Sequence, residues 1–506
     1  MILVMIRYIF NFFCLILLAL DTSAQSVVPD LTLSLEITHA DHQKYRTLAF
    51  EVPNGIERLS VETNFSQKEQ KTVIDLGLLD SSGKIVGWSG GNKDRFTVSA
   101  IDATPSFSPH IINSGRWQLL LGIPNIREGV TSTFQAKIYF SSSVNSPSSP
   151  QWVSPVLNSN PGWYRGDLHL HSGHSDGSCK NSSASQEIPC PVFLIAQKAN
   201  ELKLDFISLS DHNTVSQANS IRELQPYYDH LLMIPSRELT SFFGHANLIG
   251  NLDSFDFMAN DSINGWINPL REIQNKPFPA FVSINHPNFP NGEICMGCGW
   301  TFDPKVLEQD LIQGVEVANG DDVGTVFSGL PFWLHLLEEG RRLTAVAGSD
   351  NHHVDQSEKN RGFLARPTNV VFAHELSTQA ITSALTHGHS YIDFARQNAP
   401  EPKRIVDFNA QMGSQNFLMG DLIKLDNASS EIAIHIKLQN AQGSIARIHI
   451  SPNLSIPTEL GKISSQTYEN NFKINPPLGR SWIFLELYDD SNKLSLMTNA
   501  IYFDMN

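Results

Sequence analysis

The chain alternates short apolar runs with polar turn segments, and the spacing of these runs changes twice along its length. In the first part the runs are short and rich in β-branched or alternating residues, and Asn, Gly, Ser and Pro separate them. Short strands divided by turn signals are typical of an antiparallel β-sandwich. The predicted strands are Leu31 to Ile37, Tyr45 to Val52, Arg58 to Thr63, Thr72 to Leu79, Trp117 to Ile123 and Phe134 to Phe140.

From Gly162 to about Asn398 the pattern changes to short apolar strands followed by helix-like segments, such as Pro191 to Leu202 and Pro331 to Glu339. Alternating β and α segments predict parallel strands, with functional residues at the C-terminal ends of those strands. The predicted strands are Phe206 to Ser210, Leu231 to Ser236, Phe281 to Asn285, Gly314 to Asn319 and Thr344 to Ser349.

The last hundred residues return to strands, at Glu431 to Gln439, Ala446 to Ser451 and Trp482 to Tyr488. The changes of pattern therefore predict four segments after the N-terminal leader. They are an N-terminal β domain over 26–141, a linker rich in Ser, Pro and Asn over 142–161, a central α/β domain over 162–398 and a C-terminal β domain over 399–506.

The N-terminus has the order of a secretory signal peptide: the cation Arg7, the apolar run from Tyr8 to Leu20, and small residues ending at Ala24. The apolar run has 13 residues, whereas a membrane-spanning helix needs roughly 20. We therefore predict a signal peptide over 1–24 and a periplasmic or secreted mature chain without a membrane span. A retained N-terminal anchor is the alternative.

Charge limits the choice of partner. The 506 residues carry a formal charge of −15, with a pI near 5.6. Binding to long nucleic acids depends on basic patches that neutralise phosphates, so such a partner is not expected. Small anionic substrates stay possible, because bound divalent cations would reverse the local field.

After loss of Cys14 with the signal peptide, the cysteines form two close pairs, Cys179 with Cys190 and Cys295 with Cys298. In an oxidising compartment this pattern favours two small disulfide loops. The alternative is a four-thiolate zinc site, because Cys-x-x-Cys is a common half-site for zinc. Neither interpretation makes the cysteines catalytic.

The segment DLHLH places His169 and His171 on one face of a strand or its exit, because side chains alternate along a strand. Two imidazoles so arranged can bind one metal, with Asp167 on the same face as a possible orienting partner. Asp176 follows on a loop rich in Gly and Ser. Alone, it could equally be a turn aspartate, and His174 could compete with it as a ligand.

Four further apolar strands each end in candidate ligands. A lone histidine in such a place is more often a hydrogen-bonded core or rim residue, but this repetition at successive strand ends favours a metal site. The candidates are Asp211, His212 and Asn213, then Arg237, Glu238 and His245, then His286, and lastly Ser349, Asp350, Asn351, His352 and His353.

The ordered motifs DLHLHSGHSDG, SDHN, RE with GH, NHP and GSDNHH resemble those of the polymerase and histidinol phosphatase (PHP) superfamily. The GWYRGDLHLHS opening and the WIFLELYDDSNKLSLMTNAIYF ending are most similar to its carbaryl-hydrolase-like (CehA/McbA) branch. The resemblance covers about residues 162–398 firmly and the rest weakly. It implies an α/β fold, a distorted (β/α)₇ barrel with two or three metals, flanked here by N-terminal and C-terminal β-sandwich-like domains.

The resemblance also implies roles for matching residues. His169, His171, Glu238 and Asp350 would hold a first metal. Glu238 would bridge to a second metal held with His245 and His286. Asp176, His212 and His352 would hold a third, and Glu238, Asp350 and His286 are the expected catalytic residues.

Imidazole together with carboxylate suits zinc, manganese or iron. Such ions acidify bound water into a hydroxide nucleophile, so the sequence predicts a metal-dependent hydrolase of a small-molecule substrate. A phosphoesterase is the first hypothesis, for which Arg237, Arg361 and Arg366 are the candidate phosphate-binding cations. The alternatives are a carbamate or carboxylic ester hydrolase, and a non-catalytic exported binding protein.

Overall fold

The computed structural model describes residues 28–89, 93–142, 155–253, 255–257, 264–276, 279–291, 295, 297–302, 307, 310–394, 402–425, 431–451 and 458–505. The predicted signal peptide and residues 143–154 of the predicted linker lie outside the described residues. Among the described helices none has the length and apolar character needed to cross a membrane.

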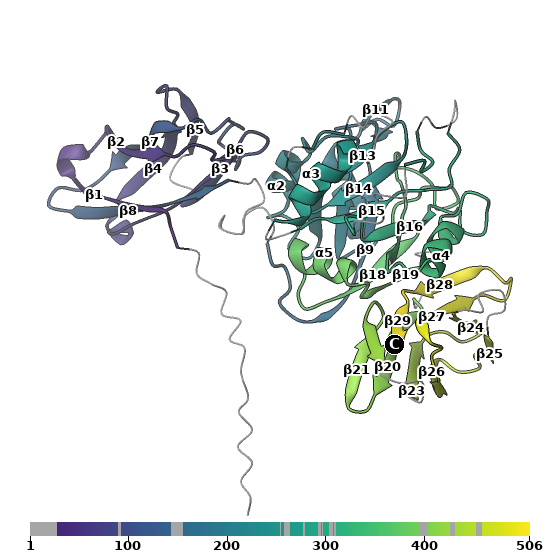
Figure 1. The fold of residues 1–506 in the computed structure, drawn as a ribbon. Helices are drawn as coiled ribbons and strands as arrows, with labels where there is room; N and C mark the ends of the chain where they lie inside the picture. The colour runs from purple at the N-terminus through teal and green to yellow at the C-terminus, as the bar shows by residue number, and fades with distance from the viewer. Residues whose placement is uncertain are drawn as a thin grey trace, which may run out of the picture.

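The N-terminal part consists of two four-stranded antiparallel sheets that enclose one apolar cluster, which includes Phe96, Trp117 and Phe134 (Figure 1). Strand β8 buries alternate residues, as expected where one face of a sheet meets a core and the other meets water. The first sheet contains β1 (Leu31–Thr38), β8 (Thr131–Ser141), β3 (Arg58–Phe65) and β6 (Arg95–Ser99). The second contains β2 (Lys44–Val52), β7 (Gly115–Asn125), β4 (Val73–Leu79) and β5 (Ile85–Ser89).

The central part is a run of hydrogen-bonded strands, most of them buried along their whole length. Parallel pairing joins β9 to β12 to β13, and again β15 to β16 to β17. Between these groups β14 is antiparallel to both neighbours. The strands are β9 (Gly162–Leu170), β12 (Phe206–Leu209), β13 (Leu232–Thr240), β14 (His245–Ile249), β15 (Phe281–Ile284), β16 (Gly314–Asn319) and β17 (Thr344–Gly348).

The described residues form five α-helices, all in the central part. In α1 the residues Val192, Ile195, Ala196 and Ala199 are buried, and this spacing of three and four residues gives one apolar face. Helix α5 begins where the Ser377 side chain accepts a hydrogen bond from the backbone N–H of Ala380. The helices are α1 (Val192–Glu201), α2 (Ala218–Leu224), α3 (Asn264–Gln274), α4 (Leu330–Glu338) and α5 (Thr378–Thr386).

The central sheet continues into the C-terminal strands. Strand β9 is antiparallel to β18 (Thr368–Ala373), which leads through β19 (Ser390–Asp393) to β28 (Leu494–Thr498) and β27 (Gly479–Tyr488). Further members of this sheet are β24 (Ile445–Ile450), β25 (Thr458–Lys462), β22 (Leu422–Leu425) and β29 (Ile501–Met505). A separate sheet contains β21 (Gln415–Leu418), β20 (Arg404–Met412), β23 (Ile432–Gln439) and β26 (Thr467–Ile474).

The predicted fold class, an α/β distorted (β/α)₇ barrel between β-sandwich-like flanks, is wrong in its class and in its barrel, whereas the N-terminal flank does consist of two packed antiparallel sheets. The structure is predominantly β-sheet, and its strands do not alternate regularly with helices. The chain passes from β13 to β14 through a hairpin instead of a helix, and β9 pairs with the antiparallel strand β18. Local apolar patterns predict strands, but they do not specify the pairing partner or direction of each strand.

The N-terminal sheets contact the central part through helix α2 (Figure 1). The Asn219 side chain donates to the carbonyl of Ile101 and accepts from the backbone N–H of Ala103. The buried carboxylate of Asp102 accepts a 2.5 Å hydrogen bond from Arg58 of β3 and pairs with Arg222 of α2. One buried carboxylate therefore joins guanidinium groups from both parts.

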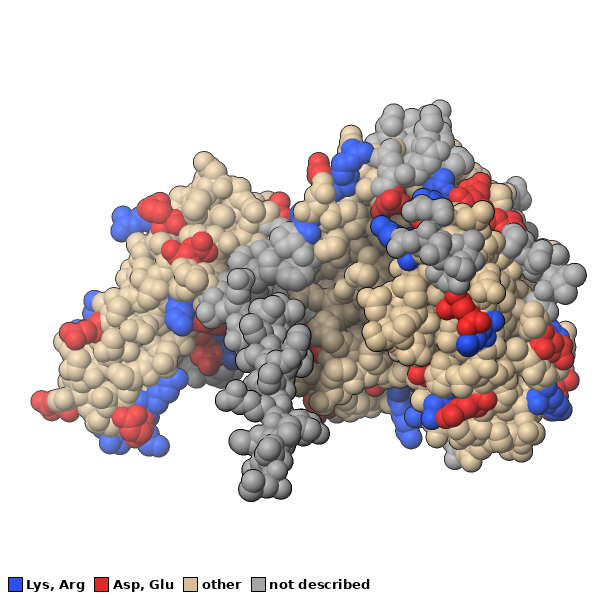
Figure 2. Space-filling view, turned by 60° about the horizontal axis from the view of Figure 1, so that its bottom comes forward, with Lys and Arg blue, Asp and Glu red and all other residues tan. Residues whose placement is uncertain are grey.

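Surface charge is mixed on the face that Figure 2 shows, where basic and acidic side chains are interspersed among the described residues. They do not gather there into one broad patch of a single sign. This face therefore offers no extended basic surface of the kind that binds nucleic-acid backbones.

Candidate metal centre

The candidate metal centre forms where successive central strands end. Backbone hydrogen bonds join the ends of β9 and β17: Asp350 N–H donates to the His169 carbonyl, and His171 N–H donates to the Asn351 carbonyl, each at 3.0 Å. Asp350 and His286 have φ angles of +53° and +28°, in the left-handed region that L residues seldom adopt. Such strained positions are typical of functional sites.

Glu238, two residues before the end of β13, lies at the middle of the cluster and is 1 % exposed. Its Oε2 atom is 3.4 Å from His169 Nε2, 3.5 Å from His171 Nε2 and 2.9 Å from His212 Nδ1. Its Oε1 atom is 3.2 Å from His245 Nδ1 and 3.3 Å from His286 Nε2. One carboxylate thus faces five imidazole rings. Its Oε2 atom faces three of them, and its Oε1 atom faces the other two.

Asp350 is the second carboxylate of the cluster. Its Oδ1 atom is 3.3 Å from His169 Nε2 and 3.0 Å from His171 Nε2. The same oxygen is 3.5 Å from His352 Nδ1. Asp350 therefore lies between two buried histidines, His169 on β9 and His171 just after it, and His352.

Asp176 is the outermost carboxylate, with 58 % of its side chain exposed. It lies 3.4 Å from His352 Nε2, 3.7 Å from His212 Nε2 and 3.8 Å from His171 Nδ1. Burial acts to lower the pKa of His352, but Asp350 and Asp176 raise that pKa to about 9. This outer group is thus the most open to solvent.

The structure brings every predicted ligand into this region, although the grouping differs in part from the predicted one. Ligand atoms within 4.8 Å of one another form the groups His169, His171 and Asp350; His169, Glu238 and His286; and His171, Asp176, His212 and His352. His245 lies beside His286 in a fourth group with Cys298.

His174 and His353 lie outside these groups. His174 Nδ1 is 2.7 Å from the Ser216 hydroxyl, which precedes α2, so it does not compete with Asp176. His353 Nδ1 contacts the Ser178 hydroxyl at the rim.

The sequence analysis missed Glu316, a buried glutamate in the middle of the apolar strand β16. Its Oε1 atom is 3.0 Å from His169 Nδ1, and its Oε2 atom accepts the backbone N–H of His286 at 2.9 Å. Carboxylates that hold the second ring nitrogen of a metal-binding histidine fix its orientation. A charged residue inside an otherwise apolar run was the signal available in the sequence.

Other polar residues hold the ligand-bearing segments. The Asn285 side chain donates to Glu238 Oε1 at 2.9 Å. Asp167 accepts backbone N–H groups of His169, Ser349 and Ala365, so it positions the chain and not an imidazole ring. Burial raises the pKa of Asp167 to about 6.

Asp211 plays a similar part in the loop that carries Asp176. Its carboxylate accepts the backbone N–H and the hydroxyl of Ser172 and the hydroxyl of Ser175.

Electrostatics fixes the protonation of the inner residues. Burial acts to lower the pKa of His169, but carboxylates, Asp350 foremost, outweigh it and raise that pKa well above its usual value. Burial acts to raise the pKa of Glu238 and of Asp350, but the histidines, His169 first in each case, hold both well below their usual range. Burial and the neighbouring His352 lower the pKa of His171 to about 4. The two carboxylates are therefore ionised at neutral pH and His171 is neutral, as metal ligands must be. His169 holds a proton in this structure, and a bound cation would have to displace that proton.

Four buried atoms of the cluster make no hydrogen bond of acceptable geometry with a described residue, although Glu238 Oε2 lies close to three imidazole rings: His169 Nε2, His171 Nδ1, Glu238 Oε2 and His245 Nε2. Leaving such a group unpaired costs about 1–3 kcal/mol. His171 Nδ1, Glu238 Oε2 and His245 Nε2 can each offer a lone pair to a cation, and His169 Nε2 can do so once a cation displaces its proton. Imidazole with carboxylate suits zinc, manganese or iron. The residues present therefore fit divalent metal ions.

The cysteines contribute no thiolate to this donor set. Cys295 and Cys298 form a disulfide, so the Cys298 sulfur beside His286 is not a free thiolate. The Cys298 carbonyl accepts from His286 Nδ1 at 3.2 Å instead.

The predicted disulfide between Cys179 and Cys190 is wrong, since both are buried free thiols. Cys179 lies on β10 (Ser178–Lys180), and Cys190 lies just after its hairpin partner β11 (Glu187–Pro189). No candidate metal-binding group among the described residues contains more than one cysteine.

A cavity of about 420 Å³ adjoins the centre at Asp350 and His352. Phe289, Phe327 and Arg361 line it, and the Arg361 guanidinium lies 4.5 Å from the Phe289 ring centre. The other two candidate cations have different partners. Arg237 donates to the carbonyl of Asp253, and Arg366 pairs with Asp321.

Comparison with known proteins adds no family. No protein-family model matches the chain, and no curated protein matches it. A Niemann-Pick type C2 protein from Japanese carpenter ant is 11 % identical with a TM-score of 0.15, covering 21 % of this chain and 94 % of its own. Chicken MD-1, complexed with lipid IVa, is 10 % identical with a TM-score of 0.13, covering 23 % and 89 %.

A third solved structure is similar at the same level. The CARDB domain of the PF1109 protein from Pyrococcus furiosus, in complex with di-metal ions, is 16 % identical with a TM-score of 0.13. It covers 20 % of this chain and 93 % of its own. Likenesses this weak support no conclusion about the fold or function of the chain.

Proposed function

We propose that the protein is an exported metal-dependent hydrolase whose centre holds two or three divalent ions. The observation that carries this proposal is the set of buried ring nitrogens and the Glu238 oxygen that converge without hydrogen-bond partners. A binding protein without metal would leave these atoms unsatisfied at a cost in stability.

In the proposed centre, His169, His171, Asp350 and Glu238 hold one ion. Glu238 is shared with a second ion held by His245 and His286, and Asp176, His212 and His352 hold a third. When bound, such ions supply an acidified water and polarise a phosphoryl or carbonyl oxygen. Glu316 and Asn285 keep His169 and Glu238 in fixed orientations, which reduces reorganisation during the reaction.

A phosphoesterase is the first choice of reaction. Arg361 lines the cavity beside Asp350 and His352, where a guanidinium can form paired hydrogen bonds with phosphate oxygens. The ordered resemblance of the ligand motifs to the PHP superfamily supports the same chemistry. This resemblance supports the choice of metal ligands, and it does not extend to the barrel fold of that superfamily.

A carbamate or carboxylic ester hydrolase is the second candidate. The walls of the same cavity include Phe289, Pro290 and Phe327, which favour an apolar or aromatic leaving group. Arg361 is the only arginine in this lining within the described part of the chain, so the cationic field for a phosphate is limited.

Export is part of the proposal and is tested separately. Cleavage after Ala24 would release the chain into the periplasm or medium. N-terminal sequencing of the recovered protein is expected to begin at Gln25 or a neighbouring residue. Recovery of intact Met1 in the membrane fraction would instead show a retained anchor.

The function is tested by metal analysis of protein purified without chelator, together with assays on p-nitrophenyl phosphate, bis-p-nitrophenyl phosphate, p-nitrophenyl acetate and an aryl carbamate. We expect two or three ions per chain and turnover of a phosphoester that chelation abolishes. Turnover of only the acetate or carbamate selects the second candidate. A folded chain without bound metal and without turnover contradicts both.

A further inference from the structure

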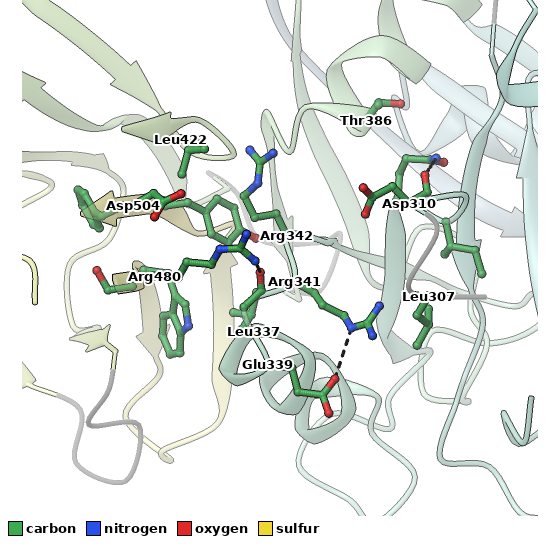
Figure 3. Close-up of a pocket in the computed structure, with 17 residues that line it drawn as sticks. Leu307, Asp310, Leu337, Glu339, Arg341, Arg342, Thr386, Leu422, Arg480 and Asp504 are labelled. Carbon is green, nitrogen blue, oxygen red and sulfur yellow. Dashed lines mark hydrogen bonds and ion pairs between the residues drawn. The ribbon is translucent and has the colours of Figure 1, made fainter. Parts of the chain in front are cut away.

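A second cavity, of about 640 Å³, lies away from the metal centre, between the end of α4 and the C-terminal strands β27 and β29 (Figure 3). Its volume lies in the range of small-molecule sites, about 300–1,000 Å³. None of the metal-centre residues lines it. The proposed hydrolase does not account for this cavity.

Strand pairing builds one wall of the cavity. In the antiparallel pair β27–β29, Trp482 lies opposite Tyr502 and Arg480 lies opposite Asp504. Side chains two residues apart on a strand share a face, so these four residues form one surface. Trp482 and Tyr502 belong to the same apolar cluster as Trp333 and Leu337 of α4, which shows that this surface faces the helix.

Three arginines line the cavity: Arg341, Arg342 and Arg480. Figure 3 shows Arg341 turned toward Glu339, at 3.4 Å, whereas Arg342 points away from Glu339. No ion pair joins Arg342 to any residue in the described part of the chain. Burial raises the pKa of the Tyr502 hydroxyl, and the charge of Arg342 acts against that rise, which places Arg342 near this wall.

Arg480 connects the two sides of the cavity. One of its N–H groups donates to the carbonyl of Gly340, just after α4, at 3.1 Å. A cation at a helix C-terminus is favourable, so capping of α4 explains part of its position. A guanidinium carries five N–H donors, however, and this contact occupies one of them.

A further donor in the wall has no partner. Trp482 is 3 % exposed, and its indole Nε1 makes no hydrogen bond with a described residue. Two of the three acids of the lining have cations beside them: Glu339 faces Arg341, and Asp504 lies between Arg480 and Lys424 in the strand register. No ion pair among the described residues involves the third acid, Asp310. The groups left without partners are therefore this one carboxylate and the donors of Arg342, Arg480 and Trp482.

We propose that this cavity binds a small organic anion, whose carboxylate or phosphate group is held by Arg342 and Arg480 and whose apolar part lies against Trp482 and Tyr502. Planar guanidinium groups match both anions through paired, charge-assisted hydrogen bonds. The aromatic wall favours a ligand with an unsaturated or aromatic body.

Calorimetric titration of the full mature chain with phenylphosphonate and with phenylacetate tests the proposal, because neither probe is a hydrolase substrate. We expect at least one probe to bind in the presence of chelator, which removes the contribution of the metal centre. Arg342→Gln should weaken that binding at least about tenfold, since a charge-assisted contact is lost. Arg342→Lys should retain part of it.

Arg116→Gln, on strand β7 of the N-terminal sheets, is the matched control and should bind like the wild type. Circular dichroism establishes that each variant is folded. If folded Arg342→Gln and Arg480→Gln both bind as the wild type does, or if neither probe binds the folded chain in chelator, the anion site is wrong. These results are independent of turnover at the metal centre.

Discussion

Glu238 shows how much of the candidate centre depends on a single side chain. Both of its oxygens face imidazole nitrogens within 3.5 Å, and it is buried. In the proposed centre it would be a ligand of two ions, and its charge would offset their mutual repulsion. Its replacement should therefore affect more than one ion.

We predict that Glu238→Gln lowers activity by more than about a hundredfold, above the 10- to 100-fold typical of a lost outer-shell partner. The loss should exceed that of His245→Ala, which removes a ligand of only one ion. Metal content and kcat/KM of both variants are the measurements. A folded Glu238→Gln protein with full metal content and near wild-type turnover would reject the bridging role.

Glu316 acts one step further out. It holds His169 Nδ1 at 3.0 Å and the backbone N–H of His286. Glu316→Gln keeps the size of the side chain but weakens the charge-assisted contact. We predict about a 10- to 100-fold loss of metal affinity, measured by competition with a chromophoric chelator. Unchanged metal affinity in the folded variant would show that Glu316 does not orient His169 for metal binding.

The outer group of Asp176, His212 and His352 should bind its ion most weakly, because Asp176 is largely exposed and lies on a loop. We predict that Asp176→Ala and His212→Ala each lose about one ion while the inner ions stay. If the lost ion stabilises the transition state, the activation free energy should rise by roughly 2.7–4 kcal/mol, and kcat should fall accordingly. Wild-type metal counts and rates in both variants would show that these residues bind no third ion and that the centre holds only two.

At the scale of elements, the contact between α2 and the N-terminal sheets depends on a buried charge. Asp102 is fully buried, as is Arg58, and Arg222 is 8 % exposed. Replacing the carboxylate would remove the negative charge that these two buried guanidinium groups share. Because α2 follows the loop that carries His212, this contact also supports the edge of the metal centre.

We predict that Asp102→Asn lowers the free energy of unfolding by about 3–5 kcal/mol, the range found when a buried ion pair loses one partner. Asp94→Asn is the control, because Asp94 and Arg95 form an exposed pair at 3.4 Å, worth about 0–1 kcal/mol. Denaturant unfolding followed by fluorescence compares them. Equal changes in the free energy of unfolding for the two substitutions would show that the buried pair stabilises the fold no more than the exposed pair does.

At the scale of the whole molecule, metal binding should be linked to stability, since ligands preferring the folded state stabilise it by mass action. Ions present at about a hundred times their Kd add about 2.7 kcal/mol. We predict that chelation lowers the melting temperature of the central part by about 5–10 °C and that zinc or manganese restores it. A chelator-treated chain with an unchanged melting temperature would contradict a metal-stabilised centre.

The sequence located most central strands but not their pairing. Phe206–Leu209 and Thr344–Gly348 lie within predicted strands, because continuous apolar runs bounded by polar residues have a local signature. The hairpin between β13 and β14 was missed, since Glu238 was taken as the residue after a strand that in fact continues to Thr240. The direction of β14 and the pairing of β9 with β18 depend on contacts far apart in the chain.

The sequence by itself determined which residues have the chemistry of metal ligands, because imidazole and carboxylate side chains at successive strand ends are visible without any fold. Only the tertiary structure decided that Glu238 faces both sets of histidines, that Glu316 holds His169, and that Arg361 is the candidate cation lining the adjoining cavity. It also decided the sheet order that replaced the predicted barrel. The physical reason is range: residue type and periodicity are local properties, whereas strand direction, burial and the distance between two charged groups arise from contacts between distant segments.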